Sequence, residues 1–553
     1  MSADALARRR AALTALAGEP FDVLIIGGGI NGAGIARDAA MRGLRTALVE
    51  RSDLASGTSS RSSKLIHGGL RYLEQGHVRL VLEAVRERER LRRLAPHLVR
   101  PQEFIFPIYR DGPVGWLTLA AGLFAYDLLA GIRNVRRHHM LGRRAVEAAE
   151  PALRKDGLRG AGQYWDCRTD DARLVLETAL SAAHEGAVIV SYAEVAGFVK
   201  EQRRIVGARI IDRIGGGELV ARARVVVNAA GPWLDCVGVL DGPGTPRLRL
   251  TKGVHVVVPR ERIGHRAAIV LHAVKDRRVM FTIPWGEHSV IGTTDTDHRG
   301  GPDVPPMVEA EDVAYLLDTV NHYFPAAALR PADVVSAFAG LRPLVAPRGK
   351  ATLSPSSVSR EEEIVTSPSG LVSIAGGKLT TYRLIAASVV DRVIAALRDA
   401  GDRRRFGRSR TGEVPLPGGA EPPDVVAAAA LSRDGHGLAP AVIGHLANRY
   451  GSRLDEVLGF LAADRRLAEP VVPGLPDPRA EVVEAVEREW ALTVEDVMRR
   501  RTQLALRDPD SGAGAAGEVS ALMAGPLGWD AETTRAAADG YVQAVRAGRR
   551  GWR

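Results

Sequence analysis

Apolar and polar positions follow a regular order over residues 21–50. Residues 23–26 form a run of four apolar side chains, which predicts a strand buried on both faces of a parallel sheet. The run ends at three consecutive glycines, and residues 33–42 then have the pattern of a helix. Residues 45–49 form a second strand that ends at Glu50. The pattern therefore predicts a complete βαβ unit in about thirty residues.

The glycines of this unit have the spacing G-x-G-x-x-G, at Gly27, Gly29 and Gly32. The first glycine allows a tight turn, the second lets backbone approach a pyrophosphate, and the third lets helix and strand pack closely. The N–H groups and the dipole at the start of the helix then face the phosphates. Glu50 lies where a carboxylate binds a ribose whose 2′-OH is free, so NADP is disfavoured. The spacing predicts a dinucleotide-binding site.

A polar loop follows at residues 51–76, rich in Gly, Ser and Thr and without a strand or helix period. Loops of this length are uncommon in a compact domain unless they bind a ligand. Its hydroxyl, ammonium and imidazole groups suit the phosphates and ring edges of a cofactor, and a solvated linker is the alternative. These groups belong to Ser56, Thr58, Ser59, Ser60, Ser63, Lys64 and His67.

Three kinds of pattern follow along the chain. Strands and helices continue to alternate and resume after residue 340, as expected for a discontinuous α/β domain. Residues 248–294 are rich in strands, and after residue 400 Pro- and Gly-rich stretches separate helical blocks. The expected helices are 1–18, 78–94, 172–185 (capped by Asp171), 379–398, 440–462 and 479–506. The expected strands are 187–191, 224–231, 255–259, 279–284, 289–295 and 371–374, with a β-ribbon at 198–220.

Composition bounds the class of protein. A chain of 553 residues is too long for one core, and its 46% apolar and 25% charged residues exclude disordered and fibrous classes. The net charge is +10, but the arginines are spread along the chain instead of forming a stripe, so we expect no nucleic-acid partner. A basic surface is still attracted to anionic lipid headgroups.

Residues 114–130 form an apolar run interrupted by Gly122 and Asp127. The run is too short to span a bilayer, but it could lie in the bilayer surface beside the basic residues Arg133, Arg136 and Arg137. Burial as an ordinary core helix is the alternative. No stretch of the chain reaches the roughly 18 uncharged apolar residues of a membrane span, and residues 8–20 do not have the pattern of a signal peptide.

Cysteine and lysine usage adds two expectations. Cys167 and Cys236 offer neither a disulfide framework nor metal-ligand spacing, which indicates a reducing compartment and no metal. Only seven of the 75 basic residues are lysines, so a lysine that remains is expected where a compact ammonium is needed. Lys64, Lys252 and Lys378 lie within the motifs described next.

Two motifs far apart in the chain agree with each other. GGG-x-x-G-A-G-x-A-x-D-x-x-x-R-G covers residues 27–43, and GGK-x-x-T-Y-R-x-x-A covers residues 376–386. On these motifs the sequence closely resembles the FAD-dependent glycerol-3-phosphate dehydrogenases of the aerobic, membrane-associated type, over about residues 20–510. Further stretches of the resemblance are KLIHGGLRYLE at 64–74, DDARLVL at 170–176, AAGPW at 229–233, KGVHVVVP at 252–259, IGTTDTD at 291–297 and GLRP at 340–343.

Pattern and resemblance together predict an α/β fold with a discontinuous Rossmann-like FAD-binding domain, a β-rich substrate domain and a helical C-terminal domain. The expected boundaries are 1–18 for an N-terminal extension, 19–95, 156–235 and 340–400 for the FAD-binding domain, 96–155 and 236–339 for the substrate domain, and 401–553 for the C-terminal domain.

The resemblance implies oxidation of sn-glycerol 3-phosphate to dihydroxyacetone phosphate, with a hydride passing from C2 to N5 of FAD and electrons passing on to a membrane quinone. It also implies a cytoplasmic protein attached peripherally to the inner face of the cell membrane, and leaves a homodimer open. A soluble oxidase that uses O₂ is one alternative. A flavin-binding protein without turnover, or a nucleic-acid-binding flavoprotein, is the alternative of another class.

This chemistry requires cations for the phosphate dianion and one base for the hydroxyl proton. His255 is the candidate base, while Arg342 and Lys378 are candidate catalytic cations, and Lys378 precedes a helix that would stabilise charge on the reduced flavin. The expected substrate-binding residues are Arg71, Tyr72, His255, Arg342, Arg360 and Lys378. The expected FAD contacts are Gly27, Gly29, Asn31, Gly32, Glu50, Thr58, Ser59, Ser63, Lys64, Leu65, His67, Gly68, Val195, Ala230, Gly231, Gly377, Leu379 and Thr380.

Overall fold

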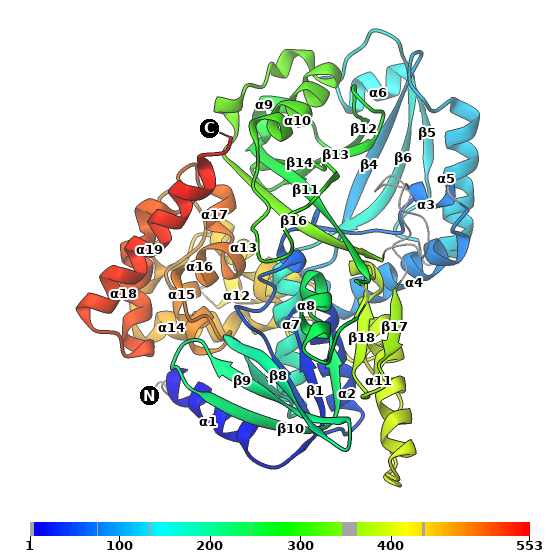
Figure 1. The fold of residues 1–553 in the computed structure, drawn as a ribbon. Helices are drawn as coiled ribbons and strands as arrows, with labels where there is room; N and C mark the ends of the chain where they lie inside the picture. Colours follow the sequence, from blue (N-terminus) through cyan, green and yellow to red (C-terminus); the bar gives the residue numbers. More distant parts are fainter. Residues whose placement is uncertain are drawn as a thin grey trace.

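Two sheets and a helical C-terminal region make up the molecule (Figure 1). The computed structural model describes residues 5–74, 76–131, 134–244, 246–345, 362–433 and 437–552, with the backbone alone of Arg71 and Glu74. The first sheet lies below the second in Figure 1, and the C-terminal helices lie beside both. The mixed α/β architecture predicted from the sequence is confirmed.

The first sheet is built around β1 (Phe21–Ile26), which is buried along its whole length. It pairs in parallel with β2 (Thr46–Val49) and with β10 (Glu218–Asn228). The strand order is β17-β18-β10-β1-β2-β7, and β8 and β9 join β10 as an antiparallel ribbon. The remaining strands are β7 (Val188–Val190), β8 (Ala193–Glu201), β9 (Arg204–Asp212), β17 (Glu363–Thr366) and β18 (Val372–Ala375).

Helices α2 (Ile30–Met41), α7 (Asp171–His184) and α11 (Tyr382–Asp399) share one apolar core with this sheet. The ribbon and helix α1 (Ala5–Ala17) enclose a second core with its other side. The sheet is thus covered on both faces, which is why its strands read as continuous apolar runs. The helix expected at the N-terminus is present, and it packs against the sheet, since Leu16 is fully buried.

The second sheet has the order β15-β11-β14-β13-β12-β4-β6-β3, with β16 paired to β11 and β5 paired to β6. Helix α10 (Ala310–Tyr323) contributes to an apolar core with this sheet, and α5 (Trp116–Ala130) packs on β6. Its strands are β3 (Leu65–Ile66), β4 (Arg100–Tyr109), β5 (His139–Gly142), β6 (Leu158–Arg168), β11 (Leu248–Pro259), β12 (Ala268–His272), β13 (Val279–Trp285), β14 (His288–Gly292), β15 (Thr296–Asp297) and β16 (Ser336–Val345). The shorter helices near it are α3 (Arg71–Glu74), α6 (Arg143–Ala149), α8 (Leu234–Val239) and α9 (Arg260–Ile263), and α4 (Val78–Leu94) packs on α5.

Two expected domain boundaries differ from this topology. Strand β6, which the sequence placed in the FAD-binding domain, pairs along its length with β4 in the second sheet. Strand β16 likewise pairs with β11 up to Val345, beyond the expected boundary at residue 340. Long-range pairing, which the local sequence of a strand does not reveal, decides which sheet each of them joins.

The C-terminal region, residues 400–552, is helical as expected, but two of its predicted helices are divided. The block 440–462 breaks at Gly451 (φ +55°), and the block 479–506 is split into α15, α16, a π-helical turn at Val497–Arg501 and α17. The cap of α7 also differs by one residue, because Asp170 and not Asp171 accepts the N–H of Arg173. The helices are α12 (Pro423–Ser432), α13 (Pro440–Tyr450), α14 (Leu454–Ala463), α15 (Ala480–Glu487), α16 (Val494–Asp496), α17 (Leu504–Arg507), α18 (Ala516–Leu527) and α19 (Ala531–Arg549).

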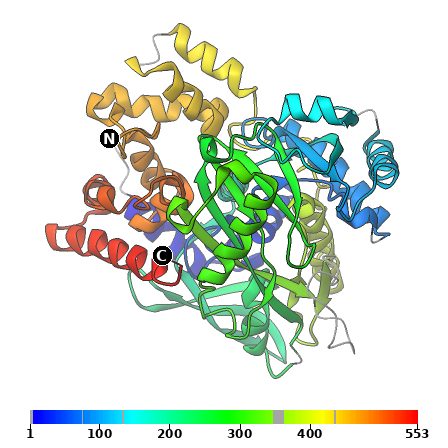
Figure 2. The ribbon, with the colours of Figure 1, turned by 90° about the horizontal axis from the view of Figure 1, so that it is seen from above.

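Figure 2 shows the molecule from above, with the C-terminal helices on one side and α4 and α5 on the opposite side. The two sheets lie between these helical layers in both views. None of the described helices is long and apolar enough to cross a membrane.

The turn from β1 into α2 leaves no room for a side chain at Gly32. A β-carbon at this position would lie 1.8 Å from the carbonyl oxygen of Gly27, and Gly27 itself has a φ of +111°. The helix therefore approaches the strand more closely than any other residue would allow.

We predict that Gly32→Ala lowers the free energy of unfolding by about 1–3 kcal/mol, because the added methyl group overpacks the turn. Gly122→Ala in α5 is the matched control, because a β-carbon there meets no atom within 4 Å. The control should be neutral or stabilising by up to about 1 kcal/mol. Urea unfolding of the two variants measures the difference, and equal effects would contradict the packing argument.

Candidate active site

Two adjoining cavities lie where the sheets meet, with volumes of about 340 and 280 Å³. The larger, which we call the Glu50 cavity, lies at the carboxyl ends of β1, β2 and β10, where ligands bind in parallel sheets. The smaller, which we call the His255 cavity, is enclosed by strands of the second sheet and by residues 376–380. The residues that line both cavities are Thr58, Ser62, Pro343, Gly376, Gly377 and Leu379.

The Glu50 carboxylate is held by two backbone amides. Its Oε2 accepts the N–H of Gly28 at 2.6 Å, and its Oε1 accepts the N–H of Ser52 at 2.9 Å. Burial raises the pKa of Glu50 although these two amides act in the opposite direction. The carboxylate is thus fixed at the edge of the cavity, close to the turn that starts α2.

The start of α2 and the polar loop face each other across this cavity. Ser59 accepts the N–H of Ile30 at 3.0 Å, so one of the first amides of the helix is already paired. Gly231 has a φ of +54°, and no atom would lie within 4 Å of a β-carbon there. Helix amides, hydroxyls and bare backbone are the groups that bind phosphate and ribose.

His255 lies on β11 and is buried between the two sheets. Its Nε2 lies 2.9 Å from Oγ of Ser63, and its ring stacks on Phe338 with the centroids 4.9 Å apart. Burial, together with the charges of Arg342 and Lys64, lowers the pKa of His255 to about 3. The imidazole is therefore neutral at pH 7, and among the described residues its Nδ1 has no hydrogen-bond partner.

Two cations line the His255 cavity. The Arg342 guanidinium donates to Oδ1 of Asp295 at 3.0 Å and to Oγ1 of Thr293 at 2.7 Å. The Lys378 ammonium donates to the carbonyl oxygen of His67 at 2.7 Å and lies 5.1 Å from the centre of the Tyr72 ring. Both side chains are thus held in one orientation, on elements far apart in the sequence.

The structure brings most of the predicted site residues to these cavities. The Glu50 cavity is lined by Gly27, Gly29, Asn31, Glu50, Thr58, Ser59, Val195, Ala230, Gly231, Gly377 and Leu379. The His255 cavity is lined by Ser63, Leu65, His67, Tyr72, His255, Arg342, Lys378 and Thr380. Arg360 and the side chain of Arg71 lie outside the described residues.

Three predicted FAD contacts do not line either cavity. Lys64 places its ammonium 2.6 Å from Oδ1 of Asp171, in a buried ion pair. The N–H of Gly68 donates to the hydroxyl of Tyr126 at 2.9 Å, and Gly32 packs against Gly27. Lys64 therefore has a structural role, because a buried ammonium group needs a carboxylate partner.

Several lining residues were not predicted from the sequence. Arg61 faces the His255 cavity and donates to the carbonyl oxygen of Ala339 at 3.2 Å, and no described carboxylate forms an ion pair with it. Burial and the neighbouring Arg499 and Arg500 lower the pKa of Arg61 to about 10. The sequence did contain a signal for Arg61, because this arginine stands between two pairs of serines in the polar loop that was predicted to bind the cofactor.

The His255 cavity also has an aromatic wall, which the sequence did not predict. It comprises Phe104, Phe106, Tyr164 and Phe281.

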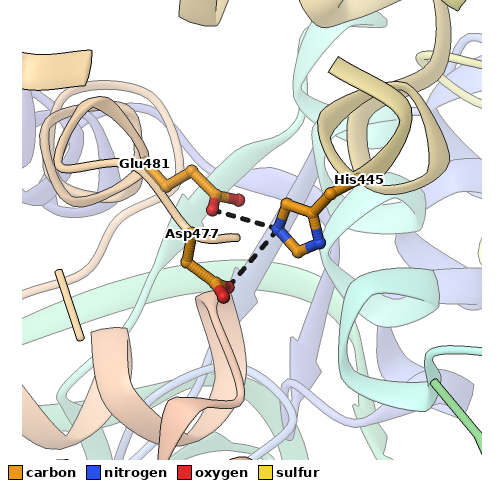
Figure 3. Close-up of side chains that lie close together, drawn as sticks. All are labelled: His445, Asp477 and Glu481. Carbon is orange, nitrogen blue, oxygen red and sulfur yellow. Dashed lines mark hydrogen bonds and ion pairs between the residues drawn. The ribbon is translucent and has the colours of Figure 1, made fainter. Parts of the chain in front are cut away.

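A group that could hold a metal lies outside both cavities, in the C-terminal region (Figure 3). Nε2 of His445 is 3.4 Å from Asp477 and 3.3 Å from Glu481, and both carboxylates also pair with Arg449. Burial opposes protonation of His445, but the two carboxylates outweigh it and raise the pKa of the imidazole. A protonated ring cannot ligate a metal, so these contacts favour an ion cluster joining α13 to α15.

Comparison with known proteins agrees with this geometry. A family model described as "FAD dependent oxidoreductase" matches residues 22–383, and one described as "C-terminal domain of alpha-glycerophosphate oxidase" matches residues 409–534. The fold is thus that of the FAD-dependent oxidoreductases.

Curated relatives match almost the whole chain. "Glycerol-3-phosphate dehydrogenase 2" of Mycobacterium tuberculosis is 41% identical over 546 residues, which are 98% of this chain and 91% of the relative. "Aerobic glycerol-3-phosphate dehydrogenase" of Staphylococcus haemolyticus is 38% identical over 88% of this chain and 87% of its own length. The chain belongs to the FAD-dependent glycerol-3-phosphate dehydrogenase family.

Solved structures show the same fold. The glycerol-3-phosphate dehydrogenase from Bacillus halodurans, complexed with FAD, superposes with a TM-score of 0.81 at 32% identity, over 99% of this chain and 98% of its own. The L-alpha-glycerophosphate oxidase from Mycoplasma pneumoniae, also with FAD bound, has a TM-score of 0.54 at 18% identity, over 72% of this chain and 100% of its own. This second likeness shows the fold alone.

The residues present fit FAD, the cofactor of this family. The adjoining cavities accommodate a long ligand, with phosphate- and ribose-binding groups in the Glu50 cavity and cationic and aromatic groups in the His255 cavity. The unpaired Nδ1 of His255 leaves one buried acceptor or donor for a further ligand in the same space.

Proposed function

We propose that this chain oxidises sn-glycerol 3-phosphate to dihydroxyacetone phosphate and passes the electrons to a membrane quinone. The observation that carries the proposal is the His255 cavity, where a neutral imidazole, a guanidinium and an ammonium lie together beside a nucleotide-binding cavity. The Mycobacterium and Staphylococcus relatives carry glycerol-3-phosphate dehydrogenase activity in their names.

In this proposal the Glu50 cavity holds the adenosine and pyrophosphate of FAD. Glu50 accepts hydrogen bonds from the ribose, and the start of α2 with Ser59 faces the phosphates. Lys378 and the residues up to Thr380 hold the flavin end. Bound FAD supplies the acceptor, at N5, for the hydride that leaves C2 of the substrate.

His255 is the proposed base for the hydroxyl proton of C2. It is neutral at pH 7 and can therefore accept a proton, but a pKa of about 3 makes it a weak base while the cavity holds no anion. A bound phosphate dianion would offset the cations near the ring and make the imidazole a stronger base. Ser63, at 2.9 Å from Nε2, orients the ring.

Arg342 is the proposed phosphate ligand, with Lys378 and Tyr72 beside it. Asp295 and Thr293 fix the guanidinium before the substrate arrives, so little conformational entropy is lost on binding. Arg71 and Arg360 are proposed as further phosphate ligands on the resemblance alone.

The proposed membrane contact is the outer face of α5. Leu117, Phe124 and Leu128 are 82%, 64% and 72% exposed and recur on one side of the helix, with Arg136 and Arg137 exposed nearby. Leu119 and Leu123 pack inward on the second sheet, so α5 is partly a core helix and partly an apolar surface. Such a face, flanked by arginines, suits an anionic lipid surface and a peripheral protein on the inner face of the cell membrane.

A soluble oxidase that uses O₂ is the second candidate. Its support is the match of residues 409–534 to the C-terminal domain of alpha-glycerophosphate oxidase. The exposed face of α5 favours the quinone-linked reaction.

The central test is anaerobic reduction of the bound flavin. Glycerol 3-phosphate should bleach the oxidised flavin band within seconds, whereas glycerol, which lacks the phosphate group, should leave it unchanged at the same concentration. Flavin that stays oxidised with both would favour a flavin-binding protein without turnover. Adding a soluble quinone and then O₂ to the reduced protein shows which acceptor restores the band faster.

We predict that Arg342→Ala raises KM for glycerol 3-phosphate by about 10- to 100-fold, since a charged hydrogen bond contributes about 1.5–3 kcal/mol.

His255→Ala should instead lower kcat by about 10²- to 10⁴-fold. His265→Asn is the matched control for the second change, because His265 bonds to Ser289 at 2.6 Å in the same sheet but lines neither cavity. Steady-state kinetics with the two effects exchanged would contradict the assigned roles.

We predict that replacing Leu117, Phe124 and Leu128 together by Ser abolishes sedimentation with phosphatidylglycerol vesicles. Turnover with a soluble dye as acceptor should be unchanged, because these side chains point away from the cavities. Val425→Ser with Leu431→Ser is the control, because both residues are exposed apolar side chains of α12 in the C-terminal region. Vesicle binding retained in the triple variant would show that another face meets the lipid.

A further inference from the structure

A buried carboxylate connects the polar loop to the C-terminal region. Asp53 lies three residues after Glu50 and is fully buried. Its Oδ2 and Oδ1 accept from the guanidinium of Arg501 at 2.6 and 2.8 Å, and Oδ2 also accepts from Nε of Arg500. The two segments are 448 residues apart in the sequence. Burial would raise the pKa of Asp53, but the two arginines outweigh it and lower the pKa, so the carboxylate is ionised.

The two arginines are themselves held in place. They end the π-helical turn Val497–Arg501, a form often found at functional sites. Nη2 of Arg500 donates to Asp496 at 2.7 Å, and Nη2 of Arg501 donates to the carbonyl oxygen of Glu489 at 2.6 Å. The C-terminal region therefore presents a prearranged pair of cations to the loop.

On the loop side, a few backbone hydrogen bonds link the Asp53 segment to the Glu50 cavity. The N–H of Ser56 donates to the carbonyl oxygen of Asp53 at 3.1 Å, and that of Ala55 donates to Gly28 at 3.0 Å. Ser52 donates its N–H to the Glu50 carboxylate at 2.9 Å. Residues 56–59 then line the Glu50 cavity.

A second contact reaches the middle of the same loop through the start of α7. Gln503 donates to Oδ1 of Asp170 at 2.7 Å, at the start of α7. The next residue, Asp171, accepts from Oγ of Ser62 at 2.7 Å and pairs with Lys64. Residues 496–503 of the C-terminal region thus contact the loop directly at Asp53 and reach Ser62 and Lys64 through the start of α7.

We propose that the C-terminal region sets how tightly the enzyme retains FAD, with Arg500 and Arg501 as positioning residues that hold Asp53 and, through it, residues 50–63. These arginines do not line either cavity, so their effect passes through the loop. The inference rests on the cofactor of the family and not on the proposed substrate.

The test is the rate of FAD release from the holoenzyme after dilution, followed by flavin fluorescence. Asp53→Asn removes the buried charge at constant size, and Arg501→Lys keeps the charge but not the bidentate fork. Both variants should release FAD at least about tenfold faster than the parent protein. Excess FAD should restore kcat, and KM for glycerol 3-phosphate should be unchanged. Because release is measured without substrate, its outcome does not depend on the proposed activity.

His445→Gln is the matched control, since it disturbs the buried ion cluster of Figure 3 in the same region without touching the loop. It should lower the melting temperature and change FAD release by less than about twofold. The proposal is overturned if Asp53→Asn and Arg501→Lys release FAD at the parent rate, or if His445→Gln releases it equally fast. A variant that folds only with excess FAD supports it, and one that does not fold even then shows a purely structural role.

Discussion

The carbonyl oxygen of Gly27 lies where a β-carbon of any other residue at position 32 would have to be. This close approach of α2 to β1 fixes the direction of the helix at its first turn, and with it the amides that face the Glu50 cavity. Glu50 and Ser59 are then tied to the same turn through Gly28 and Ile30. The shape of the Glu50 cavity, which is the proposed cofactor end of the site, is therefore a consequence of backbone packing.

The His255 cavity, which is the proposed substrate end of the site, has a different origin, because its groups come from both sheets. His255 and Arg342 lie on neighbouring antiparallel strands, while Lys378 follows the last parallel strand of the first sheet. Each is oriented by a residue from another segment: Ser63, Asp295 and the carbonyl group of His67 respectively. A cavity between two sheets allows this arrangement, whereas a single sheet edge would offer groups from one direction only.

Elements formed by neighbouring residues were predicted from the sequence, whereas the assignment of strands to sheets, which depends on long-range pairing, was not. The βαβ unit of residues 21–50 was predicted correctly because strand, glycine turn and helix follow one another within a short stretch. The sheet joined by β6 could not be predicted, since its partner β4 is chosen by tertiary pairing. Scarcity of lysine pointed to three positions, yet only Lys378 lines a cavity, while Lys64 and Lys252 are held by carboxylates. The pairing of Asp53 with Arg501 has no signature in either segment.

Thr58 and Ser62 belong to the walls of both cavities. In the proposed arrangement the same two residues would contact both the flavin and the substrate. If the binding of one ligand changes this stretch, thermodynamic linkage makes the effect mutual, so each ligand would change the affinity for the other by the same factor.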